Sequence, residues 1–493
     1  MSQRLALLAT LAWSAALVSA SGADAPWVGY RGPNGMGVFP DSAPPVDCDM
    51  KTGRNMVWTA PLPNWGSGCP VVVTLAAGAG QGSRAFVLSE PGWKSDWPVL
   101  TCLDAETGKV LWEREVNHLP ATKLSAAEQA EVSKAWHEFL ATWRDLYQTF
   151  NLAVVQKKTE EANTRFAELG YTFGGHKGGG YWQLRSLKAK DPTAAKARDK
   201  LFAKAGIHGE GWHHGCGLGT DCIGMAYATP VSDGQRVYVT TTFSGAACFD
   251  FDGNQKWLAF MPTTGKTEAY ARSPLLYRDL LLSDTFGKLV AFDKATGVVR
   301  RMVETQGGSI ATPAIVAVAG TDILLSEGKQ ADGGSVTATR LPDGKPLRVV
   351  GWGIGGTQIL ADPDRRDVAY FCGRGQHSFW TEKEMGQPAK RPLPVTKHLL
   401  LLAGDRFYGL DGSERTCDGN FKTFATLYCH GLDGKLLGQS ILTNAPVTGD
   451  KLPQVRSQAG WDTWPFSYGF PFTVAGNRLY VRSFDSLICI GAK

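Results

Sequence analysis

Residues 103–112 read LDAETGKVLW, and the phrase returns as FDFDGNQKW at 249–257 and as FDKATGVV at 292–299. Shorter copies follow, LPDGK at 341–345 and GLDGK at 431–435. Self-similarity at a fixed period is the sequence signature of a repeat architecture, so the period of these turns predicts the fold.

The turn glycines of the phrase give that period. Gly253 and Gly297 are 44 residues apart, and Gly297 and Gly344 are 47 apart. One four-stranded propeller blade takes about 40–50 residues. Gly344 and Gly434 are 90 residues apart, which leaves room for a blade with an eroded turn between them. Gly108 precedes Gly253 by 145 residues, so about 100 residues are inserted there.

The two ends of the chain complete each other. Residues 52–58 (TGRNMVW) read as a turn and a last strand with no blade before them, and 478–490 hold strands with no last strand after them. If strands from the two ends of the chain share one blade, the ring closes and leaves no open sheet edge. The sequence therefore predicts an all-β, seven-bladed β-propeller closed by N- and C-terminal strands. Eight blades is the alternative if residues 350–398 hold two.

An α-helical insertion is predicted over residues 118–205, so the propeller comprises 26–117 and 206–493. Ser125 and Glu128 form a capping box that opens a helix. Apolar residues follow at helical spacing: Trp136, Phe139, Leu140, Trp143, Leu146, Tyr147 and Phe150. A shorter helix is expected over 192–205. The stripe either packs on that helix or the propeller rim, or forms a docking surface or a lid.

Residues 1–20 are predicted to be a signal peptide. Arg4 precedes an apolar run over 5–18, and 18–20 (VSA) fit a cleavage site. The run is short for a membrane span, so we expect an exported protein, periplasmic or extracellular. The net charge of +5 is spread along the chain, which does not indicate a nucleic-acid partner.

Export permits disulfides among the ten cysteines. Four of them precede the repeated turns and should act as small buried apolar residues, far apart from one another: Cys102, Cys248, Cys429 and Cys489. Cys216 and Cys222 are close in sequence and form the disulfide candidate.

Two groups are candidates for binding, each with an ordinary alternative. His213 and His214 could supply imidazole ligands, or they lie in a disulfide-tied loop as solvated side chains. Because no metal-ligand spacing occurs, we assign no metal site. Trp461 and Trp464 could stack on a sugar or a quinone, or they pack at the ring closure. No residue has the sequence context of a catalytic nucleophile.

The repeated phrase resembles the blade motif of the PQQ-like (pyrroloquinoline quinone repeat) β-propeller family, secreted bacterial type. The residues that carry the motif are Asp104, Gly108, Trp112, Asp250, Gly253, Trp257, Asp293 and Gly297. In that family the motif's Trp docks one blade against the next. Trp58 stands one residue off this spacing, and Arg301, Arg348 and Gly438 stand at the Trp place of other blades.

The resemblance is weaker at the residues that bind the cofactor and Ca²⁺ in the enzymes of this group. Quinoprotein alcohol dehydrogenases of this group carry two adjacent cysteines beside the cofactor and hold Ca²⁺ with Glu, Asn and Asp. The sequence has no adjacent cysteine pair, and no Ca²⁺ set can be matched, so no cofactor is assigned. We expect a non-enzymatic binding or scaffold protein whose partner is a protein or a surface polymer. The alternative is a PQQ-dependent or other ligand-binding oxidoreductase.

Overall fold

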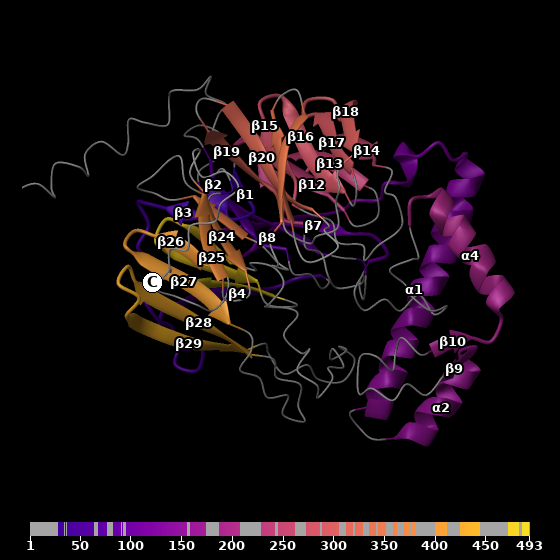
Figure 1. The fold of residues 1–493 in the computed structure, drawn as a ribbon. Helices are drawn as coiled ribbons and strands as arrows, with labels where there is room; N and C mark the ends of the chain where they lie inside the picture. The colour runs from indigo at the N-terminus through magenta and orange to yellow at the C-terminus, as the bar shows by residue number, and fades with distance from the viewer. Residues whose placement is uncertain are drawn as a thin grey trace, which may run out of the picture.

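The computed structural model of the chain is mostly β-structure with a few helices on one side (Figure 1). It describes residues 28–33, 35, 37–63, 68–75, 82–89, 91, 95–154, 158–173, 187–207, 228–241, 245–261, 273–285, 288–304, 312–318, 321–328, 335–341, 344–351, 358–361, 369–373, 376–380, 400–411, 424–443, 472–482 and 486–492.

Seven antiparallel meanders, which we number sheets I–VII, follow one another along this part of the chain. Sheet I has β5 (Val71–Thr74), β6 (Ser83–Ser89), β7 (Val99–Asp104) and β8 (Val110–Glu115). Sheet II has β11 (Val231–Ser232), β12 (Arg236–Thr240), β13 (Gly245–Asp250) and β14 (Gln255–Phe260). Sheet III has β15 (Leu275–Tyr277), β16 (Leu280–Thr285), β17 (Lys288–Asp293) and β18 (Val299–Glu304).

The remaining sheets continue the pattern. Sheet IV has β19 (Ala314–Val318), β20 (Thr321–Gly328), β21 (Ser335–Arg340) and β22 (Lys345–Gly351), and sheet V has β23 (Gln358–Ala361), β24 (Ala369–Gly373) and β25 (Gln376–Trp380). Sheet VI has β26 (Leu400–Ala403), β27 (Arg406–Asp411), β28 (Phe424–Gly431) and β29 (Leu436–Thr443). Sheet VII has β30 (Phe472–Ala475), β31 (Arg478–Arg482), β32 (Ser486–Ile490) and β4 (Met56–Pro61).

Sheet VII joins the two ends of the chain. Its outer strand, β4, comes from the N-terminal region and pairs antiparallel with β32, with Pro61 opposite Ser486 and Trp58 opposite Cys489. The sequence predicted this shared sheet from the incomplete phrases at the two ends.

The segment before β4 was not predicted to form strands. β1 (Val28–Gly29) and β2 (Gly32–Pro33) extend sheet II beyond its first strand, β11. β3 (Val38–Phe39) pairs parallel with β26, the first strand of sheet VI. Residues 28–39 therefore connect the first strands of two sheets that are far apart in chain order.

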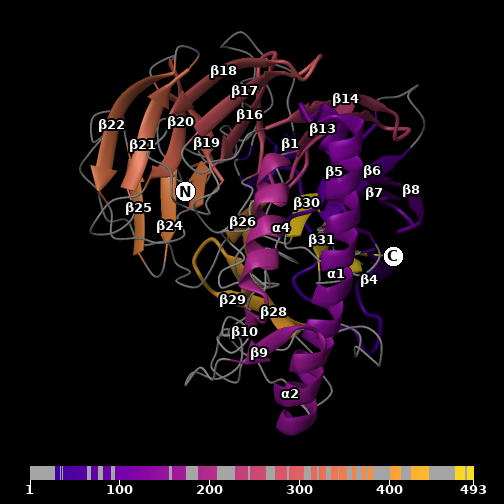
Figure 2. The same cartoon turned by 90° about the vertical axis from the view of Figure 1, so that its right-hand side faces the viewer.

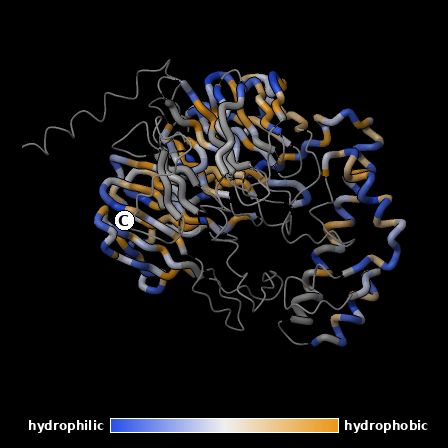
Figure 3. Tube along the Cα trace, in the orientation of Figure 1, coloured by the Kyte–Doolittle hydropathy of each residue, from blue (hydrophilic) through white to orange (hydrophobic). Residues whose placement is uncertain are grey.

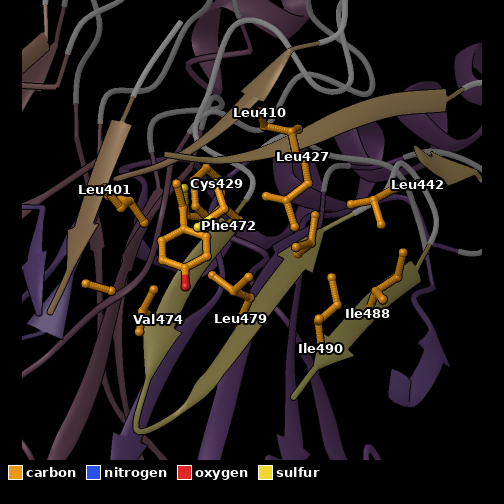
Figure 4. Close-up of a cluster of buried hydrophobic side chains, with 14 of the residues drawn as sticks. Leu401, Leu410, Leu427, Cys429, Leu442, Phe472, Val474, Leu479, Ile488 and Ile490 are labelled. Atoms are coloured by element: carbon orange, nitrogen blue, oxygen red, sulfur yellow. The ribbon is translucent and has the colours of Figure 1, made fainter. Parts of the chain in front are cut away.

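The buried core lies within and between the sheets, because alternate strand residues face opposite sides. One cluster joins sheets VI and VII (Figure 4). There, Leu401 and Leu427 of sheet VI pack with Phe472, Leu479 and Ile488 of sheet VII, and all five are at most 2% exposed. Figure 3 shows hydrophobic residues in the strands of the sheets and a mixture of hydrophilic and hydrophobic residues along the helices.

The segment between β8 and β11 forms what we call the helical arm, residues 118–205. It contains η2 (Leu119–Ala121), α1 (Ala126–Val154), α2 (Thr159–Glu168), β9 (Tyr171–Phe173), β10 (Leu187–Ala189) and α4 (Pro192–Lys204). Both views place the arm beside the sheets, with α2 at the end away from them (Figures 1 and 2). The capping box opens α1, since Ser125 N–H donates to Glu128 Oε2 at 2.9 Å.

Within the described residues, none of the helices has the length and apolar character needed to cross a membrane.

Candidate interaction site

Several of the residues that the sequence singled out lie outside the described part of the chain, together with the signal peptide over 1–20. They are His213, His214, Cys216, Cys222, Trp461 and Trp464. Their roles stay predictions. Among the residues that the structure does describe, no group of three His, Cys, Asp or Glu side chains could hold a metal ion.

The repeated turns are held by their aspartates. Asp104 Oδ1 accepts hydrogen bonds from the N–H and the hydroxyl of Thr107, both at 2.8 Å. Burial raises the pKa of the Asp104 carboxyl, but these bonds outweigh it and hold the pKa below its usual value. In sheet III, the hydrogen bonds from Arg300 and Thr296 lower the pKa of Asp293 to about 2. The motif aspartates thus act as ionised turn anchors.

The motif's Trp links one sheet to the next. Trp112 lies in β8 opposite Cys102 of β7, directly before a β-bulge. Its indole N–H donates to the Phe251 carbonyl of sheet II at 2.9 Å. The ring lies over Gly253, where an added Cβ would come within 2.9 Å of it. Gly253 also has φ +82°, a conformation that favours glycine.

The same contact recurs at two more junctions. Trp58 of sheet VII donates to the Ala105 carbonyl of sheet I at 3.2 Å and covers Gly108. Trp257 of sheet II donates to the Lys294 carbonyl of sheet III at 2.9 Å. The three indole hydrogen bonds thus join sheet VII to sheet I, sheet I to sheet II, and sheet II to sheet III.

Between sheets III and IV an arginine takes the place of the Trp. Arg301 is opposite Ala291, as Trp112 is opposite Cys102. Its guanidinium carbon lies 3.2 Å from the Cβ position of Gly344 in the next turn. The Trp place predicted from the sequence is therefore occupied by a docking side chain here too.

Hydrogen bonds also join the starts of the first strands. The N–H of Cys69 donates to Thr229 Oγ1 at 2.9 Å, Thr229 N–H donates to Ser273 Oγ at 3.0 Å, and Ser273 N–H donates to Thr312 Oγ1 at 3.3 Å. Each residue precedes the proline that opens the first strand of sheets I to IV. Cys69, Thr229 and Ser273 are at most 1% exposed, so this chain of bonds is a buried seam.

The junction between sheets VI and VII is filled by the N-terminal segment. Gly438 of β29 stands where other sheets have Trp, and its Cβ position lies against the Val46 carbonyl oxygen. Cys48 N–H donates to Ser440 Oγ of β29 at 2.7 Å, and Asp47 pairs with Arg54 at 2.9 Å. The chain itself therefore occupies the place of the missing indole.

The recurring cysteines are buried thiols. Cys102, Cys248, Cys429 and Cys489 are fully buried, and none is in a disulfide. Burial raises the pKa of Cys102, Cys248 and Cys489 to about 12. They stay protonated at neutral pH, and a protonated thiol is a poor nucleophile.

The helical arm is fixed to sheet I through one loop residue. Asp96 lies between β6 and β7, and its backbone carbonyl accepts the indole N–H of Trp136 in α1. Its carboxylate lies 2.7 Å from His137 Nδ1 and 3.3 Å from Arg144 Nη2. Three α1 side chains thus converge on a single residue of the loop between β6 and β7.

An aromatic cluster supports this anchor. Trp97, next to Asp96, packs on Trp136 with ring centroids 6.3 Å apart, and Phe202 of α4 meets Trp136 edge-on at 5.4 Å. Phe139 of α1 lies 5.8 Å from Phe202. Trp136 is fully buried and Phe202 is 3% exposed. For these residues, the predicted apolar stripe packs on α4 and the sheet.

His118 ties the two ends of the arm together. It is fully buried, and its Nε2 lies 2.6 Å from the Ala205 carbonyl oxygen. Trp97 meets its ring edge-on at 5.5 Å, and Phe260 stacks on it at 6.0 Å. Burial lowers the pKa of His118 to about 4, against the opposing effect of the Ala205 bond. A neutral ring that donates from Nε2 fits this site.

Neither a family model nor a curated protein matches this chain. Among solved structures, the chain is similar to the crystal structure of BamB from Moraxella catarrhalis, with 17% identity and a TM-score of 0.32. The alignment covers 53% of this chain and 81% of that one. A likeness of this size assigns no function.

Proposed function

We propose that this chain is an exported, seven-bladed PQQ-like β-propeller that works as a non-enzymatic scaffold. In this proposal the ring is a rigid platform, and the helical arm presents a binding surface to a protein or surface polymer. Residues 1–20 direct the chain out of the cytoplasm and are then removed.

The contacts between sheets support a ring. Side chains dock sheet VII on I, I on II, II on III and III on IV, which is the arrangement of successive propeller blades. Sheet VII closes the chain on itself through β4 and β32. Among the described residues, 352–399 contribute sheet V.

The root of the arm carries the functional proposal. Asp96 and the Trp97–Trp136–Phe202 cluster fix the arm to sheet I, and the His118–Ala205 bond holds the first and last residues of the arm together. A helix held at so many points loses little further conformational freedom when it binds a partner. A rigid arm that projects from a platform is suited to docking.

Site-specific photo-crosslinking tests this function. A crosslinking residue at exposed Ala197 of α4 or Glu131 of α1 should capture a defined exported partner, whereas one at Lys109, in an exposed turn of sheet I, should not. Crosslinks from Lys109 with none from the arm would contradict the proposal.

A second measurement separates the scaffold from the oxidoreductase alternative. The purified chain is incubated with PQQ and Ca²⁺, desalted, and examined for quinone absorbance and dye-linked alcohol oxidation. The scaffold proposal predicts neither. Stoichiometric retention of the quinone would favour the oxidoreductase.

A further inference from the structure

We propose that the solvent face of α4 binds an acidic, extended segment of a protein partner through a row of three lysines: Lys196, Lys200 and Lys204. This inference rests on the proposed scaffold function and names the chemistry of its partner.

The three lysines form one line on the helix. They recur every fourth residue, so successive side chains lie about 6 Å apart along the axis. Ala195 and Phe202 mark the buried face of α4, and the lysines lie off this face, with Lys204 opposite to it and Lys196 at its flank. All three are exposed. Lys196 and Lys200 therefore face solvent, whereas Lys204 lies near Glu128 of α1.

Several cations of the arm have carboxylate partners, unlike Lys196 and Lys200. Lys134 pairs with Glu138, Lys158 with Glu161, and Arg144 with Asp96. Within the described residues, no carboxylate lies within ion-pair distance of Lys196 or Lys200, and Lys204 reaches one, Glu128, at 3.9 Å.

The row of lysines also lowers the stability of the helix. Like charges four residues apart destabilise a helix by about 0.2–0.5 kcal/mol per pair, and α4 has two such pairs, Lys196 with Lys200 and Lys200 with Lys204. All three lysines are exposed, and among them only Lys204 reaches a neighbouring helix, through Glu128. A bound acidic segment would remove the repulsion.

The spacing favours an extended peptide. In a β-strand, alternate side chains lie on one side about 6.6–6.8 Å apart, close to the spacing of the lysines. Carboxylates on every second residue could therefore meet all three ammonium groups.

Phosphate polymers fit less well. Their recognition commonly uses the bidentate fork of arginine. The arginine of α4, Arg198, pairs with Asp199 at 3.0 Å and lies over the Phe139 ring. An anionic bilayer is a plane, whereas α4 offers it a single line of charge. We therefore assign the row to an acidic protein segment.

The experiment measures peptide binding to the full chain by fluorescence anisotropy. The probe is a labelled 12-residue peptide of alternating Glu and Thr, and the comparison peptide, 16 residues long, carries six glutamates at every third position. The test variant combines Lys196→Gln, Lys200→Gln and Lys204→Gln. The control variant, Lys51→Gln, Lys109→Gln and Lys134→Gln, removes the same charge at exposed lysines elsewhere.

The wild type should prefer the alternating peptide. Because an exposed ion pair contributes about 0.2–1 kcal/mol, the test variant should raise Kd about tenfold while the control variant changes it less than twofold. Binding should weaken in high salt. The unfolding midpoint of the test variant should not fall, whereas a structural role for the row would lower it.

Three results would overturn the inference: equal weakening in both variants, equal affinity for both peptides, or binding to polyphosphate or phosphatidylglycerol vesicles but not to the peptide. Any of these leaves the scaffold function standing if crosslinks from Ala197 persist. Retention of PQQ would instead remove the scaffold function itself.

Discussion

Replacing Gly297 by alanine tests the docking of one sheet on the next. Gly297 lies in the turn of sheet III with φ +74°, and an added Cβ would lie 2.6 Å from the Trp257 ring of sheet II. Gly53 is a matched control, because its φ is +75° and nothing lies within 4 Å of its Cβ position. Both substitutions place an alanine at a positive φ, but only Gly297→Ala brings a Cβ against an aromatic ring.

The magnitude follows from two contributions. A left-handed conformation costs a non-glycine residue about 1–2 kcal/mol, and both variants carry that cost. Overpacking against a side chain costs about 1–3 kcal/mol more, and it applies to Gly297→Ala alone. The free energy of unfolding should therefore fall by about 1–3 kcal/mol more in Gly297→Ala than in Gly53→Ala.

Urea denaturation of the two variants measures the difference. A double-mutant cycle with Trp257→Leu adds a second test, since a smaller side chain should relieve the clash and make Gly297→Ala less destabilising in that background. Equal losses in Gly297→Ala and Gly53→Ala, or strict additivity with Trp257→Leu, would refute the docking role of Trp257.

Three further predictions concern the arm and the thiols. Asp96→Asn should increase hydrogen exchange in α1 by weakening the ion pairs at the arm's root, and unchanged exchange would argue against the anchor. The pKa of His118 is about 4 in the folded chain and 6.5 in the unfolded chain. The neutral ring therefore contributes about 3 kcal/mol to the free energy of unfolding above pH 6.5, and this contribution is lost as the pH falls from 6.5 to 4. Opening of the arm, followed by hydrogen exchange, should rise as the pH is lowered across that range, and His118→Gln should flatten the response. Finally, Cys102, Cys248 and Cys489 should resist alkylation in the native protein and react after denaturation, as site-resolved mass spectrometry would show.

The sheets could be predicted from the sequence because each repeat encodes the same local contacts. Four residues after the turn glycine, two repeats have Trp and another has Arg301. The strand register places these three side chains at equivalent positions in their sheets. Trp58 comes five residues after Gly53. Asn55 lies in this stretch with φ +57°, and Trp58 still lies opposite Cys489. Local turn geometry thus accommodates the extra residue.

The N-terminal path and the arm's root could not be predicted in the same way. Strands of two residues, such as β1 and β3, have no periodicity to detect, and the strands β11 and β26 with which they pair are more than 200 residues away. Asp96 is one acidic residue in a loop, and its partners lie about 40 residues further along the chain. Such contacts depend on the assembled fold. The lysine row of α4, in contrast, can be read from the sequence, because its lysines recur every fourth residue.

The proposed ring depends most on sheet VII, and an engineered disulfide tests this sheet directly. Pro61 of β4 lies opposite Ser486 of β32. The account predicts that the double variant Pro61→Cys with Ser486→Cys forms a disulfide between its two introduced thiols under mild oxidation, with an unchanged circular dichroism spectrum. A control pair, Pro61→Cys with Asp279→Cys in the turn of sheet III, should stay reduced. Separate alkylation of both introduced thiols in the first variant, to the same extent as in the control, would contradict closure of the chain through sheet VII.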